Sequence, residues 1–178
     1  MTMLKFFSSR CGFPHQIGAV SLRRVHIEAR LEQLGISLPP QPIPKGNYIN
    51  FVKTGNLIYI AGSLPQPIDG PLMRGRLGEN MSIVEGQEAA RLAGLNMLAT
   101  LQIACDGNLD KVTRIVKIVG FINSTDDFTA QATVMNGCSD LFGEVFEAKG
   151  RHARSAIGTS VLPLGVPVEV EAIVEVEN

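Results

Sequence analysis

Hydrophobic and polar positions alternate along the C-terminal stretch of the chain. Between residues 166 and 176, valine or alanine occupies every second position, and Glu169 and Glu171 lie among the residues between them. A period of two predicts a strand with a buried apolar face and an opposite face that carries carboxylates. Residues 153–161 predict another strand, joined to this one by a turn that contains proline and glycine.

Three basic residues lie at the start of the earlier strand, namely Arg151, His152 and Arg154. If the two strands pair, these residues and the carboxylates Glu169 and Glu171 belong to one sheet. A fixed guanidinium near a carboxylate is a candidate site for a small molecule that carries a carboxylate. Spacing alone also allows a structural interpretation, a cross-strand ion pair at a subunit interface. His152, between two arginines, is expected to be a neutral histidine in a solvated loop.

The remaining elements follow from their own periodicities and end signals. In chain order they are a short helix (27–34), a hairpin of two strands (47–52 and 56–61), a loop or short edge strand (66–81), a long helix that begins with a capping box (82–105), a strand rich in β-branched residues (111–122) and a second long helix preceded by a turn that can cap it (123–148).

These elements predict an α+β fold, with one mixed sheet and two long helices packed on one face. The other face of the sheet must then be covered, and a second copy of the chain is the simplest cover. The pattern thus favours an oligomer and leaves its order open.

Residues 1–27 contain no Asp or Glu and carry several basic residues, which is the composition of a mitochondrial presequence. A disordered tail on a cytoplasmic protein is the alternative. Residues 28–44 predict a short helix and a proline-rich connector, and residues 45–178 form the predicted folded domain.

Composition narrows the classes of partner. The 178 residues carry a formal net charge of −1. Such a balanced chain has no general attraction for phosphate backbones, which weighs against nucleic acid as the main partner. The three cysteines are isolated, and no Cys/His spacing indicates a structural zinc. No apolar run is long enough to span a bilayer, so we expect no membrane partner.

Four sequence blocks fall in order between residues 45 and 176, namely GNY…GNLIYIAGSLP, SIVEGQEAARLAGLNMLATL, GFINSTDDF and GRHARSAIG…LPLGVPVEVEAIVEV. Together they resemble the long-chain branch of the RidA/YjgF superfamily, the reactive-intermediate deaminases, also labelled endoribonuclease L-PSP. The resemblance implies a chorismate-mutase-like fold assembled as a homotrimer, with its sites in the clefts between subunits.

The resemblance also implies a role for each matching residue. Arg154 would bind the carboxylate of the substrate. Glu169 would accept a proton from the attacking water and return it to the leaving ammonia. Tyr48 would line the cleft, Asn136 would join it from the second long helix, and backbone N–H groups near Ala156 would also hold the carboxylate.

The implied activity is hydrolytic deamination of reactive 2-imino or enamine acids to 2-keto acids and ammonia, which requires no metal or organic cofactor. Ala61 and Ala156 stand where the family has a serine and a cysteine in the cleft. These departures leave open a second hypothesis, a non-catalytic trimer that senses a small carboxylate. An endoribonuclease or translation inhibitor is disfavoured by the balanced charge and the lack of a basic stripe interleaved with aromatic residues.

Overall fold

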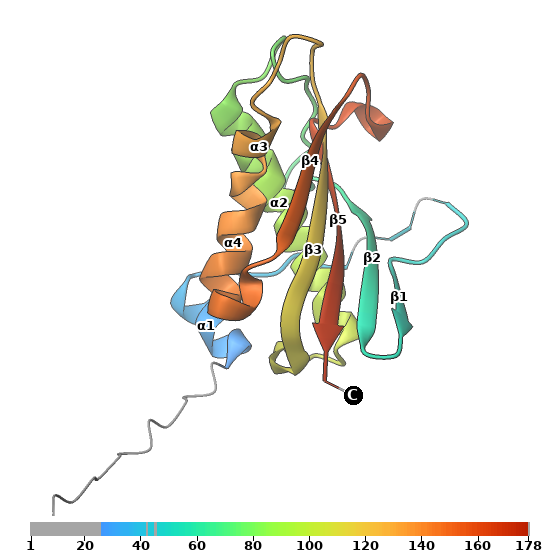
Figure 1. Ribbon diagram of the computed structural model, residues 1–178, viewed down its shortest axis with the longest axis vertical. Coiled ribbons are helices and arrows are strands. Elements are labelled where there is room, and N and C mark those ends of the chain that lie inside the picture. Colours follow the sequence, from blue (N-terminus) through green and yellow to red (C-terminus); the bar gives the residue numbers. More distant parts are fainter. Residues whose placement is uncertain (1–25, 42, 45, 178) are drawn as a thin grey trace, which may run out of the picture.

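The computed structural model describes residues 26–41, 43–44 and 46–177 of the chain (Figure 1). Residues 1–25, which hold most of the predicted N-terminal extension, lie outside the described residues. The strands are β1 (Phe51–Thr54), β2 (Leu57–Ser63), β3 (Val112–Asn123), β4 (Ala153–Thr159) and β5 (Val168–Val176). The α-helices are α1 (Ile27–Gln33), α2 (Ile83–Ala104), α3 (Gln131–Val134) and α4 (Asn136–Phe146), and short 3-10 turns cover Leu109–Lys111, Glu147–Gly150 and Pro163–Gly165.

The described strands form one mixed sheet in the order β1-β2-β5-β3-β4, in which β3 and β4 run parallel. The predicted mixed sheet is therefore confirmed, but the hypothesis that the last two strands pair is wrong, because β3 lies between β4 and β5. The connection from Thr159 to Val168 is longer than a hairpin loop and can cross one strand. Asn123, at the end of β3, secures this crossing, since its backbone N–H donates to the Pro167 carbonyl at 2.9 Å.

Helices α2 and α4 lie side by side on one face of the sheet, as predicted (Figure 1). Helix α2 begins at the predicted capping box. Ser82 Oγ accepts a hydrogen bond from the Glu85 N–H at 3.3 Å, and the Ser82 N–H donates to Glu85 Oε2 at 2.8 Å. The small residues Ala89, Ala90 and Ala93 of α2 are fully buried, so the helix packs closely against its neighbours.

The second long helix departs from its predicted form. It begins well after the polar turn that was expected to cap it, and Met135 separates α3 from α4. Asn123 of that turn is buried at the end of β3, where its side chain donates to loop carbonyls instead. Beyond the break, α4 approaches α2 so closely that a Cβ on Gly137 would overlap the Gln87 carbonyl.

Helix α1 belongs to the folded body. Ile27, predicted as the last residue of the extension, is the first residue of α1 and is 2% exposed, and Leu31 joins the core beside it. The Ile27 N–H donates to Asp110 Oδ1 at 2.8 Å. Gly35, with φ of +66°, follows the end of the helix as predicted. The later segment predicted as a loop or edge strand makes isolated bridges at Leu77, which favours the loop.

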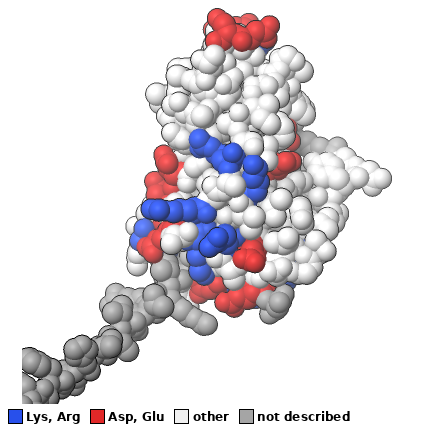
Figure 2. Space-filling view, viewed as in Figure 1, with Lys and Arg blue, Asp and Glu red and all other residues white. Residues whose placement is uncertain are grey.

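No described helix covers the other face of the sheet, which we call the open face. Its apolar side chains include Val52, Tyr59 and Ile157, which are 52%, 43% and 46% exposed. Figure 2, in the same view as Figure 1, shows a broad uncharged area above a central group of Lys and Arg side chains, which has Asp and Glu side chains beside and below it. An exposed apolar sheet face is a candidate surface for contact with another copy of the chain.

Candidate functional site

Arg154 of β4 faces the helices. It pairs across the sheet with Ile118, which is fully buried beneath them. Its Nη1 donates to Asn136 Oδ1 at 3.0 Å and to Ser139 Oγ at 2.9 Å, and its Nη2 donates to the Ala132 carbonyl at 3.0 Å. The structure thus brings the predicted residues Arg154 and Asn136 together and fixes the guanidinium with acceptors from α3 and α4.

The contacts of Arg154 leave one edge of its guanidinium available. Among the described residues, none accepts a hydrogen bond from Nε, and Nη2 has a second hydrogen beyond the one given to Ala132. An arginine that keeps an Nε–H and an Nη2–H can bind a carboxylate through both of its oxygens. Arg154 is therefore a candidate carboxylate-binding group.

A chain of hydrogen bonds through Ser139 and His152 holds Arg154 in place. His152 Nε2 lies 3.0 Å from Ser139 Oγ, and His152 Nδ1 lies 2.6 Å from the Gly150 carbonyl oxygen. Because arginine only donates and a carbonyl only accepts, Nδ1 carries the ring proton and the Ser139 hydroxyl donates to Nε2. Burial lowers the pKa of His152, in keeping with this neutral ring.

His152 lies in a loop and its lowered pKa favours the neutral ring, as predicted, but the expectation that it is solvated was wrong. His152 is half-buried beside the ring of Phe142, with the ring centroids 6.4 Å apart. Sequence reasoning also missed Ser139, because no local spacing links a serine in the second long helix to a histidine beyond its end. Only the packing of α4 against β4 brings the two side chains together.

Ala156 lies two residues after Arg154 on the same face of β4. It is partly buried against the core and pairs with Gly120. Because β4 is an edge strand of the described sheet, one of its backbone edges has no strand partner. Every second backbone N–H of β4 therefore points away from β3, and the role of N–H groups near Ala156 stays a prediction.

Glu169 lies on the opposite face of the sheet from Arg154. It pairs with Phe121 of β3, and Phe121 pairs with Ile157 of β4 on the open face. Its carboxylate lies over Gly62, where a Cβ would overlap it. Because β3 separates the two residues and they face opposite ways, Arg154 and Glu169 form no cross-strand ion pair within one subunit.

The carboxyl group of Glu169 is in an unusual environment. Burial raises its pKa above the ordinary value of 4.5, and the nearby charge of Glu171 raises it further. Among the described residues, none donates a hydrogen bond to this carboxylate. A carboxyl group with these properties can take up and release a proton closer to neutral pH than an exposed glutamate can.

A cleft of about 750 Å³ opens beside Glu169. Tyr48, which is 52% exposed, lines the same cleft, so the structure brings these two predicted residues together. Ala61 also lines it, at the position where the family has a serine. Arg154, Asn136 and Ala156 do not line this cleft, because Arg154 and Ala156 belong to β4 and Asn136 belongs to α4 beside it.

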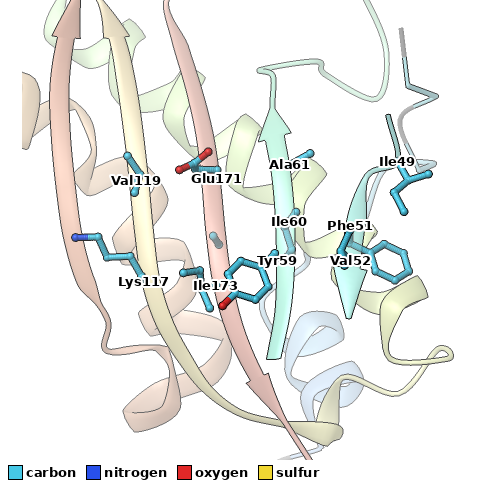
Figure 3. Close-up of a pocket in the computed structure, with 11 residues that line it drawn as sticks. Ile49, Phe51, Val52, Tyr59, Ile60, Ala61, Lys117, Val119, Glu171 and Ile173 are labelled. Atoms are coloured by element: carbon cyan, nitrogen blue, oxygen red, sulfur yellow. The ribbon is translucent and has the colours of Figure 1, made fainter. Parts of the chain in front are cut away.

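A second, smaller pocket of about 280 Å³ lies on the open face (Figure 3). Figure 3 shows the Lys117 side chain directed toward β4, where Nζ donates to Ser155 Oγ at 2.8 Å. Glu171 and Tyr59 line the same pocket. It contains none of the predicted catalytic residues, so the cleft beside Glu169 is the better candidate site.

The described residues show no other chemical centre. Within this part of the chain, no group of three or more His, Cys, Asp or Glu side chains could hold a metal ion. Burial raises the pKa of the Cys105 thiol to about 11 and that of Cys138 to about 12, so neither thiol is a ready nucleophile. Among the described helices, none is long and apolar enough to cross a membrane.

Known proteins resemble this chain in sequence. The family model described as "YjgF/chorismate_mutase-like, putative endoribonuclease" matches residues 28–176. Protein TCP17 of Trypanosoma cruzi is 44% identical over 153 residues, which cover 85% of this chain and 95% of that protein. A 2-iminobutanoate/2-iminopropanoate deaminase of Dermatophagoides farinae is 32% identical over 148 residues, which cover 80% of this chain and 95% of that protein.

The fold is shared as well. The crystal structure of the protein Atu1372 from Agrobacterium tumefaciens matches with a TM-score of 0.78 and 38% sequence identity, covering 86% of this chain and 96% of that one. The resemblance predicted from the sequence blocks and the predicted chorismate-mutase-like α+β fold are both confirmed. The chain therefore belongs to the YjgF/chorismate mutase-like family.

Proposed function

We propose that this protein hydrolyses reactive 2-imino acids, and the enamines in equilibrium with them, to 2-keto acids and ammonia. The observation that carries the proposal is the Arg154 guanidinium, which is fixed by three acceptors while Nε–H and one Nη2–H remain for a carboxylate. The half-buried Glu169 supplies a proton acceptor with a raised pKa. A relative at 32% identity is named an imine deaminase, which supports the same chemistry here.

The proposed step converts R–C(=NH)–COO⁻ and water into R–CO–COO⁻ and ammonia. Arg154 holds the carboxylate and orients the C=N carbon toward the water. The water oxygen bonds to this carbon, and Glu169 accepts one of its protons. Glu169 returns that proton to the nitrogen, the C–N bond breaks as the hydroxyl oxygen loses its own proton to the nitrogen, and ammonia leaves.

The geometry of one subunit supports a site shared between subunits. A small substrate cannot touch both Arg154 and Glu169 of one chain, because they lie on opposite faces of the sheet with β3 between them. We propose a homotrimer in which Arg154 and Asn136 of one subunit complete the cleft formed by Tyr48 and Glu169 of the next. The exposed apolar open face provides surface for such an assembly.

A mixing experiment tests the proposal. The imine is made in the cuvette by an amino-acid oxidase, and its decay is followed by stopped flow. Arg154→Ala and Glu169→Gln should each lose activity alone. When the two inactive proteins are unfolded and refolded together in equal amounts, about one quarter of the sites in a cyclic trimer regain both wild-type residues. Recovery of about one quarter of the activity is expected, and no recovery would exclude a shared site.

A second candidate is a trimer that binds a small carboxylate without turnover. It is favoured by Ala61 and Ala156, which bring no polar side chain to the proposed site. Calorimetry with a stable 2-keto acid distinguishes the two functions. Binding that requires Arg154, together with an unchanged rate of imine decay, would select the sensor over the enzyme.

A further inference from the structure

In one subunit, before Arg154 and Asn136 of the neighbouring subunit complete it, the cleft beside Glu169 is larger than a three-carbon imino acid requires. Its volume of about 750 Å³ falls within the range of about 300–1,000 Å³ that is typical of pockets for drug-sized ligands. The loops that follow β2 and β4 supply much of its wall. Apolar side chains from these loops line it, namely Leu64, Leu72, Pro163 and Leu164.

A buried polar side chain, that of Asn96, lines this cleft. Asn96 of α2 lines the cleft and is 2% exposed. Its side-chain Nδ2 donates to the carbonyls of Leu64, Gln66 and Leu92 at 3.2, 2.8 and 2.9 Å, which fixes the orientation of the amide. Among the described residues, none donates to its Oδ1. Asn96 thus presents an unused acceptor to a ligand that brings an N–H or O–H group.

We infer that the substrate is a 2-imino acid with an apolar side chain of four or more non-hydrogen atoms, of the kind that oxidation of leucine, methionine or phenylalanine gives. This inference rests on the proposed function and names the substrate class of the same site. The apolar side chain lies against Leu72 and Leu164, and the polar end of the molecule lies toward Asn96 and Glu169. A three-carbon imino acid would leave this apolar wall in contact with water.

The apolar wall predicts a specific order of substrates. Each additional methylene group in an apolar pocket improves discrimination by about tenfold or somewhat more. We therefore expect kcat/KM for the leucine-derived and phenylalanine-derived imines to exceed that for the alanine-derived imine by about tenfold or more. An alanine-derived imine that is hydrolysed as fast as the larger ones would overturn the inference.

Variants of the wall provide the matched test. Leu164→Ala shortens a side chain that is 44% exposed, so little effect on folding is expected. It should lower kcat/KM for the leucine-derived imine by about fivefold more than kcat/KM for the alanine-derived imine. Leu72→Ala should act in the same direction. Val84→Ala, on α2 away from the cleft and 73% exposed, is the control and should change neither.

A binding measurement separates this inference from the proposed function. The probes are 4-methyl-2-oxopentanoate and pyruvate, the stable keto acids that correspond to the leucine-derived and alanine-derived imines. Calorimetry should give a Kd for the larger acid about tenfold lower than that for pyruvate. If no imine is hydrolysed but this ratio holds, the proposed function fails and the size preference stands. Equal Kd values for the two acids would overturn the size preference, whatever the turnover.

Discussion

The two halves of the proposed site are built in opposite ways. The Arg154 half is polar and fixed, because Asn136, Ser139 and the Ala132 carbonyl all hold the guanidinium. The Glu169 half is an open cleft with apolar walls, in which no described residue donates a hydrogen bond to the carboxylate. The first half is suited to recognise a carboxylate, and the second to move a proton and accept a variable side chain. Binding and chemistry are thus assigned to different faces of one sheet.

The largest expected effect is at the fixed half. Arg154→Ala removes two charge-assisted hydrogen bonds to the substrate, each worth about 1.5–3 kcal/mol, so kcat/KM should fall by about 100-fold or more. Arg154→Lys keeps the charge but cannot make the two parallel bonds, and it should recover little. Stopped-flow measurement of imine decay checks both variants, and near-wild-type activity of the lysine variant would show that only charge is needed.

The cleft half should be easy to disturb without unfolding the protein. A Cβ on Gly62 would overlap the Glu169 carboxylate, which is the free end of a flexible side chain. Gly62→Ala should therefore displace Glu169 and lower kcat/KM by about 10- to 100-fold. Its free energy of unfolding should stay close to that of the wild type. Urea denaturation checks the stability, and a variant with full activity would argue against the assigned position of Glu169.

The fixed half should respond to a glycine substitution in the opposite way. A Cβ on Gly137 would overlap the backbone carbonyl of Gln87, which cannot move aside without shifting α4 from α2. We expect Gly137→Ala to lower the free energy of unfolding by about 2 kcal/mol. Gly143→Ala, in the same helix, would meet nothing within 4 Å and serves as the control. Equal stability of the two variants in urea would contradict the close packing.

The sequence predicted most elements of the fold because their signals are local. The capping box at Ser82 and the alternation in β5 each depend on residues a few positions apart, and both are confirmed. The position of β3 between the last two strands is not a local property. It depends on which backbone edges pair, and the pattern of β4 and β5 fits a hairpin equally well.

In the candidate site, too, the features that depend on strand order could not be predicted from local sequence. The structure brings Arg154 together with Asn136 and places Tyr48 and Glu169 in one cleft, whereas the family resemblance implied a single site for all four. The separation of these two pairs onto opposite faces could not be predicted, because it follows from the strand order. Ser139 was missed for a related reason, since its role comes from a contact between α4 and β4 rather than from any spacing.

A smaller effect is expected at Ser139, which supports Arg154 without touching the substrate. Ser139→Ala removes one acceptor from the guanidinium and one donor to His152. Because a hydrogen bond is worth about 1 kcal/mol, KM should rise by about fivefold while kcat changes little. Ser155→Ala, on the other face of β4, is the matched control and should leave KM unchanged. A fall in kcat instead of a rise in KM would place Ser139 in the chemical step.

The smallest expected effect is a shift in the pH profile of the cleft half. Glu169 must be ionised to accept a proton, so kcat/KM should rise with pH through its raised pKa, above the ordinary value of 4.5. Because the pKa of Glu169 is higher in the folded protein than in the unfolded chain, the folded protein binds this proton more tightly. The contribution of Glu169 to stability is therefore present at low pH and is lost as the pH rises through that pKa.

The charge of Glu171 is one of the two causes of this shift, and it can be removed alone. Glu171→Gln should lower the pKa of Glu169 and move the rising limb of kcat/KM to lower pH. Because Glu171 is exposed, salt should screen its effect, and the two proteins should give the same limb at about 1 M salt. Glu175→Gln is the control, because the Glu175 carboxylate binds Asn56 and Thr113, and it should not move the rising limb.

If the rising limb is unaffected by Glu171→Gln at low salt but disappears in Glu169→Gln, burial alone sets the pKa of Glu169. If it persists in Glu169→Gln, the proton acceptor is another group.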